Sequence, residues 1–376
     1  MAEYGRRLAA IQGRMAEAGM DVLLLTGEHD IRYVTGFFTP FWQSPTRPWF
    51  VVVPVSGMPE AVIPSIGRAL MLRGFVGAVH DWPSPVEHDD GISLLAEVIR
   101  RLGGSQAQLG LPMGRETKLM MPLQDLEELM QALGDAMLVD ATALMRQQRM
   151  IKSEAEIDKI RHACQTAGSV FAGLPGWVRQ GMPLVEVFRG FRQHALAAGL
   201  DEVPYLVGGA GHGGYGEIIA PPDETPLQAG AVLMLDTGAC YDGYFCDFDR
   251  NFAIGPTTAE AREAHQLLWQ ATEDALAAIR PGMTAAELFG IMAKRLGGGD
   301  DSVGRFGHGL GMQLTEPPSH ISWDETVLEE GMVLTLEPSL GLGNGLMQVH
   351  EEDLVLRADG PQLLTPRASR ELPQIG

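Results

Sequence analysis

Acidic residues at the ends of two apolar segments are the side chains of this sequence best suited to chemistry. Asp236 follows "VLML" and Glu337 follows "VLTL". An isolated carboxylate is costly in an apolar interior, so each acid needs a neutralising partner if its strand is buried. The alternative is a solvent-exposed strand end, but the same arrangement in two segments favours a shared site.

The segment after Asp236 predicts where further carboxylates lie. In "DTGACYDGYFCDFDR", Asp242-Gly243 is a two-residue hairpin signal. Counting back from this turn without a bulge places Asp236 opposite Asp249. Side chains alternate between the faces of a strand, so both acids share one face with Asp247. Three carboxylates that close would repel one another, so the pattern predicts a metal ion among them.

More donors come from later segments. In "MQVHEEDLVL", Glu351 and Glu352 both remain candidates for the inward position, and "GRFGHGLGMQLTEPP" sets His308 among glycines too numerous for a good helix or strand. A mostly oxygen donor set with one imidazole suits a hard or borderline divalent ion. Four carboxylates exceed the usual needs of one ion, so we expect two ions and an activated water as nucleophile.

An internal repeat positions these acids. "RQGMPLVE" at 179–186 matches "RPGMTAAE" at 280–287 in four of eight positions, and "LQAGAVLMLD" at 227–236 matches "LEEGMVLTLE" at 328–337 in five of ten. The offset is 101 in both cases (280 − 179 and 328 − 227). Each copy has the pattern of a turn, a helix and a glycine-led strand, which predicts two similar α/β units that face each other.

The N-terminal part has a different organisation. "DVLLLTG", "PWFVVVPV" and "EAVIP" predict buried strands, and residues 92–103 and 122–134 predict helices. Ser153 and Glu156 form a capping box that opens a further helix. We therefore expect a boundary near residue 148, with domains at 1–148 and 149–376.

Composition limits the function classes. The 376 residues are 45% hydrophobic, which is typical of a soluble globular protein. The net charge of −20 disfavours nucleic acid and anionic membranes as partners, because both would repel the protein. The start, "MAEYGRRLAAIQGRMAEAGM", is unlike the continuous apolar core of a signal peptide, and no apolar run approaches the length of a membrane span. Cys164, Cys240 and Cys246 form no disulfide framework, so we expect a reducing cytoplasm and a small-molecule substrate.

Taken together, these segments resemble the creatinase and prolidase group of pita-bread metallohydrolases, which includes aminopeptidase P and methionine aminopeptidase. The motifs are "LDTGACYDGYFCDFDRNFAIG", "GHGLG", "TLEPSL" and "VHEEDLVL", and "DVLLLTGEHDIRYVTGF" is similar to the start of the creatinase-type N-terminal domain. The resemblance implies an α/β (α+β) chain, in which an N-terminal creatinase-like α/β domain precedes a pita-bread catalytic domain built from two similar halves.

The resemblance also implies a ligand set for two divalent ions, whether manganese, iron, cobalt or zinc. Counting back from Asp359-Gly360, which matches the strand ending of the group, favours Glu351 over Glu352. Glu337 is implied to orient or deprotonate the metal-bound water as well. The five implied ligands are Asp236, Asp247, His308, Glu337 and Glu351.

Three positions depart from the peptidase members of the group. Ile219 stands where they carry a histidine 17 residues before the first metal aspartate (236 − 17), Thr315 replaces the histidine of "HExP", and Asp249 replaces the threonine of "DxTR". His212, from the glycine-rich loop before Ile219, is a further substrate-binding candidate. Because the ligands remain while two histidines are missing, weak or absent Xaa-Pro dipeptidase activity is predicted.

The aromatic segment "GFFTPFWQSPTRPWF" at 36–50 bears on assembly. Creatinase-type relatives are dimers whose N-terminal loops reach the neighbouring active site. The resemblance therefore implies a homodimer in which Arg47 or Trp42 approaches the metals of the second chain.

The function expected from the sequence is hydrolysis or elimination of a small, nitrogen-containing metabolite at a dinuclear site. An Xaa-Pro dipeptidase is the alternative, and a catalytically silent metal-containing binding protein is the third possibility.

Overall fold

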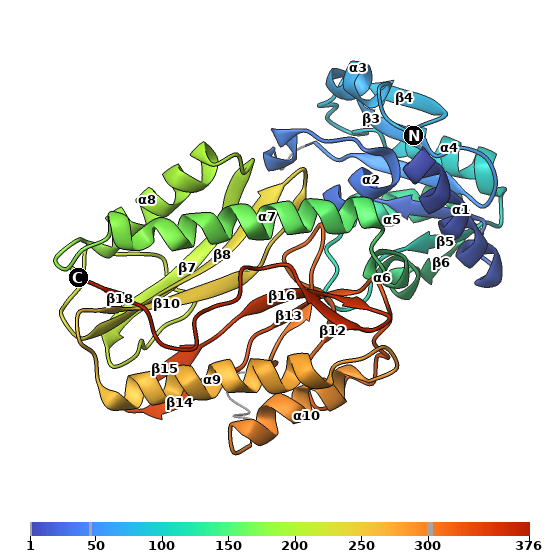
Figure 1. The fold of residues 1–376 in the computed structure, drawn as a ribbon. Helices are drawn as coiled ribbons and strands as arrows, with labels where there is room; N and C mark the ends of the chain where they lie inside the picture. Colours follow the sequence, from blue (N-terminus) through green and yellow to red (C-terminus); the bar gives the residue numbers. More distant parts are fainter. Residues whose placement is uncertain (1, 45–46, 299–303) are drawn as a thin grey trace. The chain divides into compact units, whose positions relative to one another are not determined.

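The computed structural model describes residues 2–44, 47–298 and 304–376. The chain forms two compact units, Met1–Arg149 and Met150–Gly376 (Figure 1). Among the described helices, none has the length and apolar character that crossing a membrane requires.

A mixed six-stranded sheet with the order β4-β3-β2-β1-β5-β6 is the centre of the first unit. β1 and β2 are buried along their whole length, which explains their continuous apolar sequences. The predicted strands and helices of this unit are confirmed. Its elements are α1 (Ala2–Glu17), β1 (Val22–Leu25), α2 (Glu28–Thr35), β2 (Phe50–Pro54), β3 (Glu60–Pro64), α3 (Arg68–Met71), β4 (Ala78–Trp82), α4 (Ile92–Gly103), β5 (Gln108–Leu111), α5 (Leu123–Leu133), β6 (Met137–Asp140) and α6 (Thr142–Met150), with short 3-10 turns at Pro40–Gln43 and Ser65–Gly67.

The second unit contains two larger sheets, with the orders β18-β10-β8-β7 and β12-β11-β13-β16-β17, and a separate β14-β15 pair. Its helices are α7 (Glu154–Gly173), α8 (Leu184–Ala197), α9 (Ala259–Ala278) and α10 (Ala285–Arg295), with a 3-10 turn at Leu174–Gly176. Its strands are β7 (Glu202–His212), β8 (Ala231–Tyr241), β9 (Tyr244–Phe245), β10 (Phe248–Ile254), β11 (His308–Gly309), β12 (Glu316–Ser319), β13 (Val333–Leu336), β14 (Ser339–Gly343), β15 (Leu346–Val349), β16 (Glu352–Arg357), β17 (Gly360–Leu363) and β18 (Gln374–Ile375).

Helices of the second unit are divided between its two sheets. α7 and α8 pack on β8 and β7, and the rings of Phe171 and Phe248 lie 5.3 Å apart between helix α7 and strand β10. Apolar residues of α9 and α10 share a core with β13 and β16, among them Leu288 and Leu334. Figure 1 shows the two helix pairs on opposite sides of this unit. The two halves therefore have the helix-on-sheet arrangement that the repeat predicts.

The repeat itself is confirmed by backbone hydrogen bonds that occur at equivalent positions in the two copies. The Gly181 N–H donates to Leu227 O at 2.8 Å, and the Gly282 N–H donates to Leu328 O at 2.8 Å, with both numbers raised by 101. The same shift relates two isolated β-bridges, Pro183–Pro226 and Thr284–Val327. Each copy thus places the turn before its helix against the turn before its strand, which fixes where the strand begins.

Local signals explain how the second unit begins. The Ser153 hydroxyl accepts a hydrogen bond from the Glu156 N–H, and the Glu156 carboxylate accepts one from the Ser153 N–H. This is the predicted capping box, which satisfies donors that the first turn of α7 leaves without helical partners. The chain then runs as one helix to Gly173.

One structural expectation was wrong. His308 lies in a strand, β11, although its surroundings are rich in glycine. β11 is only two residues long and lies between β12 and β13. A Cβ atom on Gly309 would lie 2.1 Å from Pro317 O, and Gly307 has a φ of 131°. The glycines therefore allow close contact between neighbouring strands, and they do so within a sheet rather than in a loop.

Candidate metal centre

The structure brings the five residues of the predicted ligand set into two overlapping groups. Asp247, His308 and Glu337 form one group, and Asp236, Asp247 and Glu351 form the other. In each group one potential ligand atom per residue lies within 4.8 Å of the others. Asp247 belongs to both groups, so its carboxylate occupies the position of a bridge.

The β8–β10 hairpin places the first two acids as its register predicts. Asp236 pairs with Asp249 in the ladder. Asp242 and Gly243 have φ angles of 45° and 78°, as the turn type expected for this dipeptide requires. Asp247, two residues before Asp249, then lies on the same face as Asp236.

His308 presents one particular ring nitrogen to the acids. Its Nδ1 lies 2.8 Å from Gly309 O, and a carbonyl can only accept, so Nδ1 carries the proton. Nε2 lies 2.9 Å from Glu337 Oε1 and 3.4 Å from Asp247 Oδ2. When the ring is neutral, Nε2 is an acceptor, so it and the two carboxylate oxygens are three acceptor atoms that face one another. A proton or a cation between them is required.

The carboxylates differ in their response to this crowding. Burial, followed by the negative charge of Glu337, raises the pKa of Asp236 to about 7. Burial and neighbouring carboxylates raise the pKa of Asp247 and of Glu351 well above the usual range. Burial opposes ionisation of Glu337, but the charge and hydrogen bond of His308 outweigh it and lower its pKa to about 2. Protons therefore occupy some of these acids whenever no other cation does.

Two buried oxygen atoms support a metal rather than a purely protonated site. Asp236 Oδ1 and Glu351 Oε2 have no hydrogen-bond partner among the described residues. Buried polar atoms are rarely left without partners. Because each belongs to a predicted ligand, a bound cation accounts for both, and the mixed carboxylate and imidazole donors fit a divalent ion.

Glu352 is directed away from this cluster by ion pairs. Its carboxylate accepts hydrogen bonds from Arg250 Nη2 at 3.1 Å, from Arg367 Nη1 at 2.8 Å and from the Ala368 N–H at 2.8 Å. Thr365 also donates to it. These donors anchor Glu352 at the start of β16, so Glu351 takes the inward position.

A small cavity of about 130 Å³ lies over the ligand cluster. Its lining consists of the five predicted ligands together with Tyr205, Arg305, Leu314 and Thr315. The Tyr205 hydroxyl donates to the Asp236 carboxylate. The sequence did not reveal Tyr205, because a bulge between Glu202 and Tyr205 interrupts the register of β7 on β8. The sequence analysis did not single out Arg305 either, although it stands three residues before His308.

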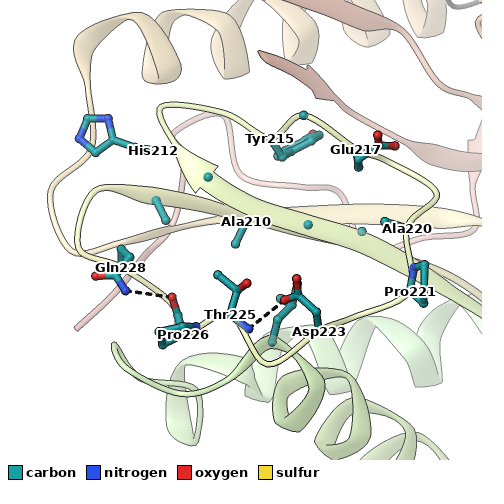
Figure 2. Close-up of a pocket in the computed structure, with 16 residues that line it drawn as sticks. Ala210, His212, Tyr215, Glu217, Ala220, Pro221, Asp223, Thr225, Pro226 and Gln228 are labelled. Atoms are coloured by element: carbon teal, nitrogen blue, oxygen red, sulfur yellow. Dashed lines mark hydrogen bonds between the residues drawn. The ribbon is translucent and has the colours of Figure 1, made fainter. Parts of the chain in front are cut away.

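The other substrate-binding candidates of the second unit do not line this cavity. Ile219 is 69% exposed and does not line the small cavity. His212 lines a different cavity of about 340 Å³, whose lining shares no residue with the first. Figure 2 shows Ala210 pointing from β7 toward Thr225 in that cavity, with His212 at its far end. Asp249 is buried and accepts a hydrogen bond from Asn251.

Arg47 and Trp42 belong to the first unit and pack within it. The Trp42 ring lies 5.9 Å from that of Trp49, and the Arg47 guanidinium lies 5.6 Å from the Phe41 ring centre. Within one chain the aromatic segment thus has ordinary packing partners. The approach of Arg47 or Trp42 to the metals of a second chain stays a prediction.

Two facing α/β halves that enclose carboxylates and one histidine, after a separate α/β unit, define a pita-bread metallohydrolase. The chain belongs to metallopeptidase family M24, whose model matches residues 158–358. The creatinase/prolidase N-terminal domain matches residues 7–151. The predicted family and fold class are therefore confirmed.

Similar proteins carry peptidase names. A probable dipeptidase, PepE, of Mycobacterium tuberculosis is 29% identical over 351 residues, covering 90% of this chain and 88% of that protein. An Xaa-Pro dipeptidase of Pyrococcus furiosus is 32% identical over 240 residues, covering 60% of this chain and 65% of that protein. The crystal structure of dipeptidase PepE from Mycobacterium ulcerans has a TM-score of 0.85 and 29% identity, covering 100% of this chain and 98% of that chain.

Proposed function

We propose that the protein is a metal-dependent dipeptidase that holds two divalent ions on Asp236, Asp247, His308, Glu337 and Glu351. The sharing of Asp247 between two ligand groups carries this proposal. The names of the relatives favour dipeptide hydrolysis, to which the Xaa-Pro dipeptidase alternative belongs, over hydrolysis or elimination of a nitrogen-containing metabolite. The three buried, unbridged cysteines are compatible with the reducing cytoplasm that we expect.

Several residues of the chain have separate roles in such a site. Bound divalent ions supply a water of lowered pKa and polarise the carbonyl group that is attacked. Glu337 is our candidate for orienting or deprotonating the attacking water, and its Oε1 lies 2.9 Å from His308 Nε2. The Tyr205 hydroxyl orients the Asp236 carboxylate. The Gly309 carbonyl fixes the His308 tautomer, so that Nε2 remains the ligand atom.

Substrate preference is where this chain departs from Xaa-Pro peptidases. Thr315 lines the cavity with a hydroxyl where those peptidases have an imidazole. A hydroxyl donates only a neutral hydrogen bond, whereas an imidazole can also change protonation near neutral pH. We therefore expect Xaa-Pro dipeptides to be poor substrates. This departure, together with the exposed Ile219, keeps the small nitrogen-containing metabolite as a second candidate substrate.

The test is turnover by protein loaded with manganese, cobalt, iron or zinc, offered dipeptides and small amides. Hydrolysis of a dipeptide that stops with chelator and returns with metal supports the proposal. Turnover of small amides alone favours the second candidate. Metal retention without turnover of any substrate favours a binding protein. Hydrolysis that is unaffected by complete removal of metal contradicts a metal-dependent site.

A further inference from the structure

Strand β7 has an outer edge that no other strand of the described chain covers. β7 is the last strand in the order β18-β10-β8-β7, and over the described residues β8 is its only partner. Alternate residues of such a strand direct their N–H and C=O groups away from the sheet. Outside the ladder with β8, residues 206–210 make no further backbone hydrogen bond to the described main chain. This stretch therefore presents donors and acceptors that can pair with another strand.

The internal repeat shows what such an edge can bind. In the second copy β11 pairs with β13, as β7 pairs with β8, but β11 also pairs on its other edge with β12. That ladder joins Gly309 to Glu316, and the positions 101 residues earlier are Gly208 (309 − 101) and Tyr215 (316 − 101). Tyr215 is not paired with β7. In the described part of the first copy, a strand equivalent to β12 is thus missing.

Tyr215 pairs with β15 instead. Its N–H donates to Met347 O at 3.2 Å, and its carbonyl accepts from the Met347 N–H at 2.9 Å. Its hydroxyl donates to Asn251 Oδ1 at 3.1 Å and accepts from the Val349 N–H at 2.7 Å. Because these contacts fix both the backbone and the buried ring of Tyr215, this segment does not supply the missing strand.

The cavity of about 340 Å³ lies along the same edge. Residues 208–212 of β7 line it, and a strand of five residues is about 17 Å long. Figure 2 shows Tyr215 and Glu217 on one side of β7, with Thr225 and Pro226 on the other. The space beside β7 therefore suits a short peptide in extended conformation.

The lining also indicates which side chains such a peptide carries. The acids Glu217 and Asp223 line the cavity and are exposed, and neither lysine nor arginine is among the lining residues. Leu184, Ala210 and Pro226 add apolar surface. Side chains of a strand alternate between its two faces, so basic residues can face Glu217 while small apolar residues face Ala210. An alternation of basic and small apolar residues fits both walls.

We propose that the outer edge of β7 binds an extended, basic peptide segment of a partner protein as an additional strand, in the position that β12 has on β11. Main-chain hydrogen bonds to β7 hold the segment, and Glu217 and Asp223 select its positive charges. The two cavities share no lining residue, so this site is separate from the proposed metal centre.

The experiment titrates manganese-loaded protein with acetyl-Val-Lys-Val-Lys-Val-amide, whose blocked ends prevent it from acting as a dipeptide. N-methylation of the first, third and fifth residues, or of the second and fourth, blocks one edge of the peptide strand at a time. We expect one methylated form to bind like the parent peptide and the other to bind about tenfold or more weakly. Acetyl-Val-Glu-Val-Glu-Val-amide should bind more weakly than the parent peptide.

Variants test whether binding occurs at β7. Ala210→Trp fills part of the cavity and should weaken binding of the lysine peptide about tenfold or more, whereas Ala197→Trp, at the exposed end of α8, should not. Both should retain the metal content of the unmodified protein, because neither residue lines the metal cavity. Glu217→Lys combined with Asp223→Lys, at two exposed positions, should reverse the preference from the lysine to the glutamate peptide.

Hydrogen exchange followed by mass spectrometry gives a direct readout. The lysine peptide should slow exchange within residues 206–212 and leave α9 unchanged. Equal binding of the two methylated peptides overturns the inference, as does binding that Ala210→Trp leaves unchanged or no binding at millimolar peptide. Amides of β7 that are protected in a dimer and exchange in a monomeric Ala210→Trp variant would assign this edge to a second copy of the chain, and would overturn it as well.

Discussion

Asp247 has more effect on the proposed centre than any other single carboxylate, because it belongs to both ligand groups. Asp247→Ala should therefore lose both ions, whereas Glu351→Gln should weaken mainly the group that contains Asp236. Metal analysis after gel filtration measures the two losses. Glu263→Ala, which removes an exposed acid on α9, is the matched control. An Asp247→Ala protein that kept two ions and full activity would contradict the ligand set.

The raised pKa of Asp236 leads to a prediction about pH. Its pKa in the folded, metal-free protein is about 7, against 3.8 for an ordinary aspartate, so the folded state binds more protons between these values. Stability from this group is complete below about pH 4 and is lost as the pH rises through about 7. Urea unfolding of metal-free protein should accordingly occur at lower urea at about pH 7.5 than at about pH 5.

Metal should reverse this trend, because ions bind only the ionised carboxylates and displace the protons. We expect the stabilisation by added manganese to grow over the same pH window, with apparent affinity rising about tenfold per pH unit for each proton displaced. Titrations at several pH values measure it. A pH-independent metal effect would mean that protonated acids do not compete for the site.

Thr315 and Ile219, which stand where Xaa-Pro peptidases carry histidines, lead to a further prediction about single residues. Thr315 lines the cavity, while Ile219 is 69% exposed. Thr315→His should raise Xaa-Pro dipeptidase activity, since one positioned donor is typically worth on the order of a hundred-fold in rate. Ile219→His alone should change little, and the double variant should exceed Thr315→His only if the loop moves inward on substrate binding. Robust Xaa-Pro turnover by the unmodified protein would contradict the expectation that Xaa-Pro dipeptides are poor substrates.

How far the sequence predicts the site depends on the kind of signal. The register of Asp236 and Asp249 follows from a two-residue turn, because a hairpin leaves little freedom in pairing. Tyr205 could not be placed in this way, since its strand pairs across a bulge and its partner is distant in sequence. The contact of Arg305 with Thr315, ten residues later, depends on packing that no local pattern contains.

Among the elements, the start of α7 is tied to β12 by a buried ion pair. Lys152 Nζ lies 3.1 Å from Glu316 Oε2, with side chains 2% and 4% exposed. Removal of one partner leaves a buried charge, so Lys152→Met should cost about 3–5 kcal/mol in the free energy of unfolding. Lys152→Met combined with Glu316→Gln should recover part of that loss. Urea unfolding measures both, and a cost below about 1 kcal/mol for the single variant would contradict the argument.

The elements show where local reasoning succeeds and fails. The repeat and the capping box at Ser153 are patterns of sequence alone, and both are confirmed in the structure. The strand at His308 could not be predicted, because glycine disfavours an isolated strand. Here neighbouring strands supply the ladder, and the absence of a side chain on Gly309 is what lets Pro317 approach.

At the scale of the whole molecule, the homodimer remains the main untested expectation. Phe38, in the aromatic segment, is 43% exposed in the single chain. We expect analytical ultracentrifugation to give twice the 40.6 kDa of one chain. Arg47→Ala should lower activity without lowering metal content if this side chain reaches the site of the second chain. A fully active monomer would contradict both statements.

The sharing of ligands between the two halves also affects the unfolded chain. Each ligand group draws on both copies of the repeat, and Asp247 and Glu351 are 104 residues apart (351 − 247). An ion held between them closes a long loop, as a disulfide does, and ties together segments that diffusion must otherwise bring into contact. Metal available during synthesis would thus act on folding before any substrate is present, and refolding should be faster with manganese than with chelator.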